Sequence, residues 1–168
     1  MSQLTHSLDS SLLVRDVTGD YRPANADEVL QAAQRVLARR MHDCEALNSP
    51  QVVRDFLRVK LGALEHEVFA VIHLDAQNRV IEYVEMFRGT VSQTSVYPRE
   101  VVKESLARNS AALLLVHNHP SGSTQPSRAD EMLTQALKSA LALVDVRVLD
   151  HLIVAGGDIL SMAERGLL

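Results

Sequence analysis

Two histidines and an aspartate lie close enough in the sequence to bind one metal ion. His117 and His119 follow an apolar stretch, Ala111–Val116, and Asp130 stands near the start of the next amphipathic segment. Residues two apart on an extended chain point to the same side, so both imidazoles can face a single point in space. The prolines and the glycine between His119 and Asp130 can fold the chain back toward that point. Two imidazoles and a carboxylate are ligands that suit zinc.

Three protein ligands would leave the fourth position of a tetrahedral zinc ion open. Such a position is typical of catalytic zinc, where it holds a water molecule whose pKa the metal lowers to about 7. A second interpretation needs no metal, because Ser127 and Asp130 also fit a capping box at the start of a helix. A lone His-X-His pair is likewise often two ordinary loop histidines. The histidine pair at a strand end, the chain reversal and the acidic helix start favour the metal site in combination.

The same residues resemble the JAMM, or MPN-plus, metalloprotease signature, in which His-X-His-Pro precedes a serine and an aspartate. His117, His119, Ser127 and Asp130 occupy its positions. The similarity to the RadC family covers about residues 47–168 and is carried by Tyr97–Glu100, His117–Gly122, Pro126–Ser127 and Leu149–Val154. The resemblance implies a zinc-dependent hydrolase, a metallopeptidase or isopeptidase, which cleaves an amide bond in a protein or peptide substrate.

The resemblance also implies a role for each residue of the signature. His117, His119 and Asp130 would ligate the zinc ion, and Ser127 would help to stabilise the oxyanion that forms at the scissile carbonyl. The general base of this family is a glutamate at the start of the first core strand. It takes a proton from the water on the metal and passes it to the leaving amine.

Two glutamates compete for the position of this general base. Glu67 directly precedes the apolar run Val68–Leu74, whereas Glu65 lies two residues earlier and would point to the same side of an extended segment. Glu67 is the better candidate because the adjoining apolar residues would partly desolvate its carboxylate, which suits a base. A solvated strand edge is the alternative for both residues.

The hydrophobic pattern predicts the elements that position these residues. Helices are expected from Asn25 to about Met41, from Ser49 to Gly62, from Pro98 through Leu106, and from about Ser127 to Leu143. Strands are expected over residues 67–74, 79–87, 111–117, 146–154 and 159–160, and the first two form a hairpin. Mixed strands and helices in this order indicate an α/β layered domain. The resemblance narrows the fold to the JAMM/MPN type, which is cytidine-deaminase-like, with a mixed central sheet flanked by helices.

The first part of the chain differs from the rest. Residues 1–24 are polar and show no sustained period, which predicts a mobile arm or a loose cover, and an amphipathic helix follows. Residues 1–46 do not resemble the helix-hairpin-helix segment of full-length RadC proteins. We therefore expect an N-terminal arm and helix over residues 1–46 and a RadC-like JAMM/MPN-plus domain over residues 47–168.

Composition bears on partners and compartment. The 17 Lys and Arg against 21 Asp and Glu make the net charge −4, which makes general nucleic-acid binding doubtful, and the basic pair Arg54 and Arg58 is expected to be a solvated face. The longest apolar stretch is too short to span a membrane. Cys44 is the single cysteine, which rules out an internal disulfide and fits a reducing compartment. A cytoplasmic protein without a membrane partner is expected.

The sequence leaves other assignments open. A catalytically silent binding or accessory module of DNA-repair or mobile-element systems is the main alternative function, and a zinc deaminase or nuclease is a third. The deaminase usually needs a P-C-x-x-C motif, which a single cysteine cannot supply.

Asp150 and His151 could lie behind the metal or form a satisfied polar pair at a strand start. His73 is expected to be a packed core histidine, Asn118 to shape its loop, and the substrate and oligomeric state are undetermined.

Overall fold

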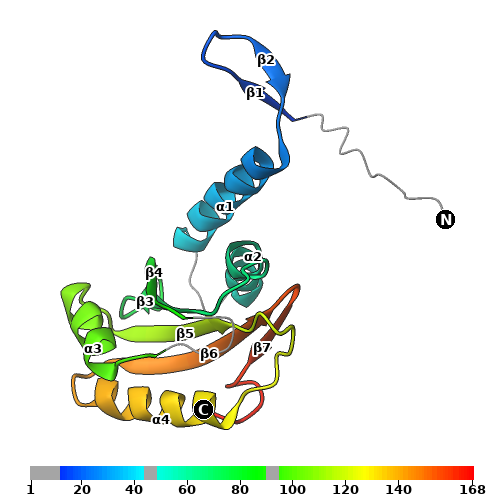
Figure 1. The fold of residues 1–168 in the computed structure, drawn as a ribbon. Helices are drawn as coiled ribbons and strands as arrows, with labels where there is room; N and C mark the ends of the chain where they lie inside the picture. The colour runs from blue at the N-terminus through cyan, green and yellow to red at the C-terminus, as the bar shows by residue number, and fades with distance from the viewer. Residues whose placement is uncertain (1–11, 44–48, 90–94) are drawn as a thin grey trace, which may run out of the picture.

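The computed structural model describes residues 12–43, 49–89 and 95–168, which form an α/β fold (Figure 1). Cys44 lies outside these ranges. In chain order the elements are β1 (Leu13–Arg15), β2 (Tyr21–Pro23), α1 (Ala26–His42), α2 (Pro50–Leu61), β3 (Val68–Leu74), β4 (Val80–Arg88), α3 (Pro98–Ala107), β5 (Ala112–Asn118), α4 (Arg128–Ala142), β6 (Arg147–Ala155) and β7 (Asp158–Ser161). Among the described residues, none of the helices is long and apolar enough to cross a membrane.

A mixed sheet of five strands, in the order β4-β3-β5-β6-β7, forms the centre of the fold, as the sequence predicted. β3 pairs antiparallel with both β4 and β5, whereas β5 pairs parallel with β6 and is joined to it through α4. Every residue of β3 and β5 is buried. The last residues of β5, the middle strand, therefore lie at the end of the sheet where the chain leaves toward α4.

Helices cover both faces of this sheet, with α2 on one side and α3 and α4 on the other (Figure 1). Side chains of β3 alternate between the two layers because successive residues of a strand point to opposite faces. Ala70 and Ile72 pack with the α2 residues Phe56 and Leu57. Phe69 and Val71 pack instead in a second core with residues from α3 and α4. The central sheet is thus flanked by helices, which confirms the predicted layering.

The N-terminal segment contains regular structure that the sequence did not predict. The sequence indicated only a mobile arm or a loose cover over residues 1–24, of which residues 1–11 lie outside the described ranges, and Leu13–Arg15 and Tyr21–Pro23 pair as a small antiparallel hairpin. Its turn is built by local polar contacts, since the Asp16 carboxylate accepts hydrogen bonds from the backbone N–H groups of Thr18 and Asp20 at 2.9 and 3.0 Å. Such Asx-type turns leave no trace in hydrophobic periodicity, which explains why the sequence did not predict the hairpin.

The end of α2 lies against the turn between β6 and β7. Gly62 follows the helix as predicted, and a Cβ atom at this position would lie 2.3 Å from the carbonyl oxygen of Gly156 in the β6–β7 turn. Only glycine fits such a contact, because a real Cβ atom needs well over 3 Å from a backbone oxygen. Ser49 is the N-cap of α2 and Pro50 its first residue, as predicted, although the Ser49 side chain makes no capping hydrogen bond.

Candidate metal centre

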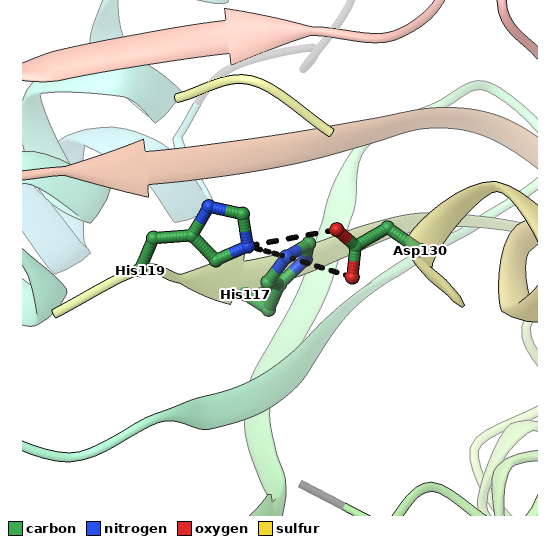
Figure 2. Close-up of side chains that lie close together, drawn as sticks. All are labelled: His117, His119 and Asp130. Carbon is green, nitrogen blue, oxygen red and sulfur yellow. Dashed lines mark hydrogen bonds and ion pairs between the residues drawn. The ribbon is translucent and has the colours of Figure 1, made fainter. Parts of the chain in front are cut away.

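His117, His119 and Asp130 come together where β5 leaves the sheet. His117 is buried near the end of β5, His119 follows that strand directly, and Asp130 lies in the first turn of α4. Figure 2 shows the two imidazoles and the carboxylate pointing toward one another. Each side chain offers one ligand atom, and these atoms all lie within 4.8 Å of one another.

The separations of the three ligand atoms suit a small metal ion. His117 Nε2 and His119 Nε2 are 2.8 Å apart, and the nearest Asp130 oxygens lie 3.3 Å from the first nitrogen and 3.6 Å from the second. A tetrahedral zinc ion with bonds of about 2.0–2.1 Å would hold its ligand atoms about 3.3 Å apart. The observed distances lie on both sides of that value. Together with the nitrogen and oxygen donors, they show that this group could bind a metal ion.

The charges of the group also suit a cation. Burial opposes ionisation of Asp130, but hydrogen bonds with His117 and His119 outweigh it and hold the pKa of the carboxyl well below its usual range. The hydrogen bond with Asp130 in turn raises the pKa of His119. The aspartate is therefore a carboxylate at neutral pH. A metal ion would compete with a proton for His119 Nε2, so metal affinity should fall as the pH falls.

Ser127 and Asp130 form the capping box that the sequence allowed as the metal-free alternative. The Ser127 hydroxyl oxygen accepts from the Asp130 backbone N–H at 3.1 Å, and Asp130 Oδ2 accepts from the Ser127 backbone N–H and hydroxyl, both at 2.7 Å. The two interpretations are compatible in the structure. Capping occupies Oδ2 from the serine side, while Oδ1 is the oxygen that lies 3.3 Å from His117 Nε2.

Glu67 and Glu65 line different cavities. Glu67 lines a cavity of about 550 Å³ together with all three residues of the metal group and Ser127. Glu65 lines another cavity, which is also lined by Gly62, Gly156 and His119 but by neither His117 nor Asp130. The extended segment that was expected to carry both glutamates is interrupted, because the chain bends at residues 65 and 66 before β3 begins. This placement favours Glu67 as the carboxylate next to the metal group.

Asn118 contributes to the site in a way that the sequence did not indicate. Its buried side chain accepts a hydrogen bond from the Val68 backbone N–H at 2.7 Å and donates one to the His66 carbonyl at 3.0 Å. These two groups stand on either side of Glu67. The residue between the two histidines thus holds the chain that carries the glutamate. No sequence pattern predicts this contact, because it depends on the pairing of β3 with β5.

Asp150 and His151, which are adjacent in sequence, have different contacts. Asp150 accepts hydrogen bonds from the His151 backbone N–H, the Ser161 hydroxyl and the Ala163 backbone N–H, so it ties strand β6 to the C-terminal turn. The His151 ring instead contacts His117, with 2.8 Å between Nε2 and Nδ1. Burial lowers the pKa of His151 well below its ordinary value. His151 therefore lies directly behind a residue of the metal group.

His73 is a packed core histidine, as the sequence predicted. Its side chain is completely buried, and Nδ1 lies 2.8 Å from the Ser110 hydroxyl. Nε2 has no hydrogen-bond partner within the part of the chain that the structure describes. Burial is the main cause that lowers the pKa of His73 to about 4, so the ring is neutral at physiological pH.

Comparison with known proteins shows what the chain is similar to. Residues 47–167 match the family described as the RadC-like JAB domain. A UPF0758 protein from Leptothrix cholodnii is 57% identical over 150 residues, which cover 89% of this chain and 68% of that protein. A UPF0758 protein from Aromatoleum aromaticum is 60% identical over 146 residues, covering 86% and 65%, and one from Acidovorax sp. (strain JS42) is 55% identical over 164 residues, covering 98% and 69%. The chain spans about two thirds of the length of these relatives.

Proposed function

Because the chain belongs to the RadC family, we propose that it is a zinc-dependent hydrolase that cleaves amide bonds in a protein or peptide substrate. The observation that carries the proposal is the convergence of His117, His119 and Asp130 beside Glu67 in one cavity of about 550 Å³. Three ligands and a nearby carboxylate are the arrangement that hydrolytic metal sites use, because one coordination position is left for a water.

Each residue of this site has a chemical role in the proposal. Zinc bound by the three ligands would act as a Lewis acid and lower the pKa of a coordinated water to about 7. The carboxylate of Glu67 accepts a proton from the attacking water. It then delivers this proton to the nitrogen of the leaving amine. His117 is buried and His119 partly so, which holds both rings in place, and both residues line the cavity together with Glu67.

Ser127 lines the cavity and is the proposed donor to the oxyanion. Its hydroxyl has a single proton, which in this structure is donated to Asp130 Oδ2. In the reaction that proton must turn toward the substrate carbonyl oxygen as negative charge develops there. The backbone N–H of Ser127 continues to hold Asp130 Oδ2 at 2.7 Å, so the carboxylate keeps its orientation during this change.

The setting of the proposed reaction follows from charge and composition. A protein or peptide substrate suits the chain better than nucleic acid, because the net charge is −4. The basic face of α2 is already neutralised, since Arg54 pairs with Glu164 and Arg58 with Asp55. The single cysteine in the sequence fits a reducing compartment, and we propose the cytoplasm.

The proposal is tested by measuring zinc content and amide hydrolysis for the wild type, Glu67→Gln and the matched control Glu65→Gln. We expect one zinc ion per chain in all three proteins. Turnover of peptide and isopeptide libraries should fall by at least about 100-fold in Glu67→Gln, because the general base is lost. Glu65→Gln should retain turnover, since the cavity that Glu65 lines includes neither His117 nor Asp130.

Two outcomes of this experiment would contradict the proposal. Purified, unchelated wild type without a stoichiometric transition metal would remove the basis of the site. Stoichiometric zinc with equally silent wild type and Glu67→Gln would favour the alternative of a binding or accessory module whose metal is structural.

A further inference from the structure

A chain of hydrogen bonds runs behind the metal group and connects two of its members. His117 Nδ1 lies 2.8 Å from His151 Nε2, and His151 Nδ1 lies 2.6 Å from Thr134 Oγ1. Thr134 Oγ1 lies 2.6 Å from the backbone carbonyl oxygen of Asp130. The three side chains that these hydrogen bonds connect are all buried, and they come from three different elements: His117 from β5, His151 from β6 and Thr134 from α4.

The direction of this chain is determined at its far end. The carbonyl of Asp130 can only accept, so at 2.6 Å the Thr134 hydroxyl must donate its single proton to it. Thr134 Oγ1 is then an acceptor toward His151, whose Nδ1 must carry a hydrogen. Burial favours a neutral imidazole, which leaves His151 Nε2 as an acceptor.

The same reasoning reaches the metal group. Because His151 Nε2 accepts, His117 Nδ1 must carry its ring hydrogen and His117 Nε2 must keep its lone pair. His117 Nε2 is the nitrogen that lies 2.8 Å from His119 Nε2 and 3.3 Å from Asp130 Oδ1. The hydrogen-bond chain thus aims a lone pair at the centre of the group. The opposite direction would put a hydrogen on that nitrogen and leave two oxygens 2.6 Å apart without a proton between them.

We propose that His151 and Thr134 are positioning residues that hold His117 in the Nδ1–H tautomer, so that its Nε2 is permanently available to a metal ion. The proposal rests on the proposed function, because it concerns the same metal site. Outer hydrogen bonds of this kind orient a ligating histidine and increase the basicity of its metal-binding nitrogen. Thr134 also links the two sides of the site. It accepts a hydrogen bond from His151, which contacts His117, and it donates one to the backbone carbonyl of Asp130.

The tautomers can be measured without any activity assay. In ¹⁵N-labelled wild type near neutral pH, two-bond ¹H–¹⁵N spectra of the imidazole rings distinguish Nδ1–H from Nε2–H. We expect both His151 and His117 to be Nδ1–H in the metal-free protein, and His151 to remain so when zinc is added. His151→Gln serves to assign the His151 signals. Finding His151 as the Nε2–H tautomer would overturn the proposal.

Zinc affinity provides the second readout, measured by competition with a chromogenic chelator. His151→Leu should weaken zinc binding by about 10- to 100-fold, and His151→Gln, which can still accept from His117 Nδ1, should recover part of the loss. Thr134→Val removes the hydroxyl at nearly constant volume and should also weaken binding, whereas Thr134→Ser should resemble the wild type. His73→Leu is the matched control, because His73 is equally buried but hydrogen-bonds Ser110.

The outcomes separate this inference from the proposed function. A wild type that binds zinc, with His151→Leu and Thr134→Val binding it equally tightly, would overturn the role of the hydrogen-bond chain alone. A wild type that binds no zinc would overturn the proposed function, while the tautomer measurement would still decide the direction of the chain. If His151→Leu does not fold, the comparison of Thr134→Val with Thr134→Ser decides the affinity test.

Discussion

The side chain of Asn118 holds the backbone on both sides of Glu67. Its amide accepts from the Val68 N–H and donates to the His66 carbonyl, and the residue itself stands between His117 and His119. One buried side chain therefore ties the segment that carries the proposed base to the strand end that carries the two histidines, although 50 residues of sequence separate Asn118 from Val68.

Replacement of Asn118 should affect turnover more than zinc binding. Asn118→Ala leaves two backbone groups without their partners, which costs about 1–3 kcal/mol for each group that stays buried, and it releases the segment that carries Glu67. We expect kcat to fall by about 10- to 100-fold at saturating zinc, because small displacements of a catalytic group have large effects. Asn118→Asp, which keeps the acceptor for Val68, should be less affected. Wild-type turnover in Asn118→Ala would show that Glu67 needs no such support.

Substitution of Ser127 should reveal two functions, and the chain offers a matched control. Asn25 caps α1 in a capping box with Glu28, as Ser127 caps α4 with Asp130. Ser127→Ala and Asn25→Ala should each lower the free energy of unfolding by about 1 kcal/mol in urea titrations. If Ser127 stabilises the oxyanion, only its replacement should lower kcat, by about 10²- to 10³-fold at saturating zinc. Equal turnover in the two variants would leave Ser127 with the capping function alone.

The buried histidine of the core should make stability depend on pH. His73 has a pKa of about 4 in the folded protein against an ordinary value of 6.5, so between these values the unfolded chain binds more protons. Its contribution is complete above about pH 6.5 and is lost as the pH falls toward 4. At about 1.4 kcal/mol per pKa unit, the loss can reach about 3 kcal/mol.

The measurement compares urea unfolding of wild type and His73→Leu between pH 4 and 8, with a chelator present so that metal release does not contribute. The free energy of unfolding of His73→Leu should fall less steeply over the acidic range, because the variant has no imidazole to protonate on unfolding. Parallel curves for the two proteins would mean that His73 titrates in the folded state much as it does in the unfolded chain.

Gly62 should tolerate no side chain. The Cβ atom of Gly62→Ala would lie 2.3 Å from the Gly156 carbonyl oxygen and 2.6 Å from that of Arg58, so α2 or the β6–β7 turn must shift. We expect a loss of about 1–3 kcal/mol in the free energy of unfolding, as for other overpacked sites. Gly157→Ala is the control, because its Cβ atom would meet nothing within 4 Å. Equal stability of the two variants in urea would show that the approach of α2 to the turn is not tight.

The sequence by itself determined the features that depend on near neighbours. The order of helices and strands in the sheet domain follows from hydrophobic period, and the capping residues Asn25 and Ser127 lie where the pattern placed them. The spacing of His117, His119 and Asp130 was sufficient to suggest that they meet, because a short reversal connects a strand end to the next helix. The N-terminal hairpin was missed although its contacts are local, since they are polar and carry no period.

Only the tertiary structure decided which distant residues support that group. Glu67 faces the same cavity as the histidines because β3 runs antiparallel to β5, with Phe69 paired to His117. His151 lies behind His117, 34 residues away in sequence, because β6 pairs parallel with β5 after the α4 crossover. Strand register and crossover direction arise from packing of the whole sheet between its two helical layers. Because β3 and β5 are buried on both faces, their hydrophobic pattern does not specify which residues of the two strands stand opposite each other.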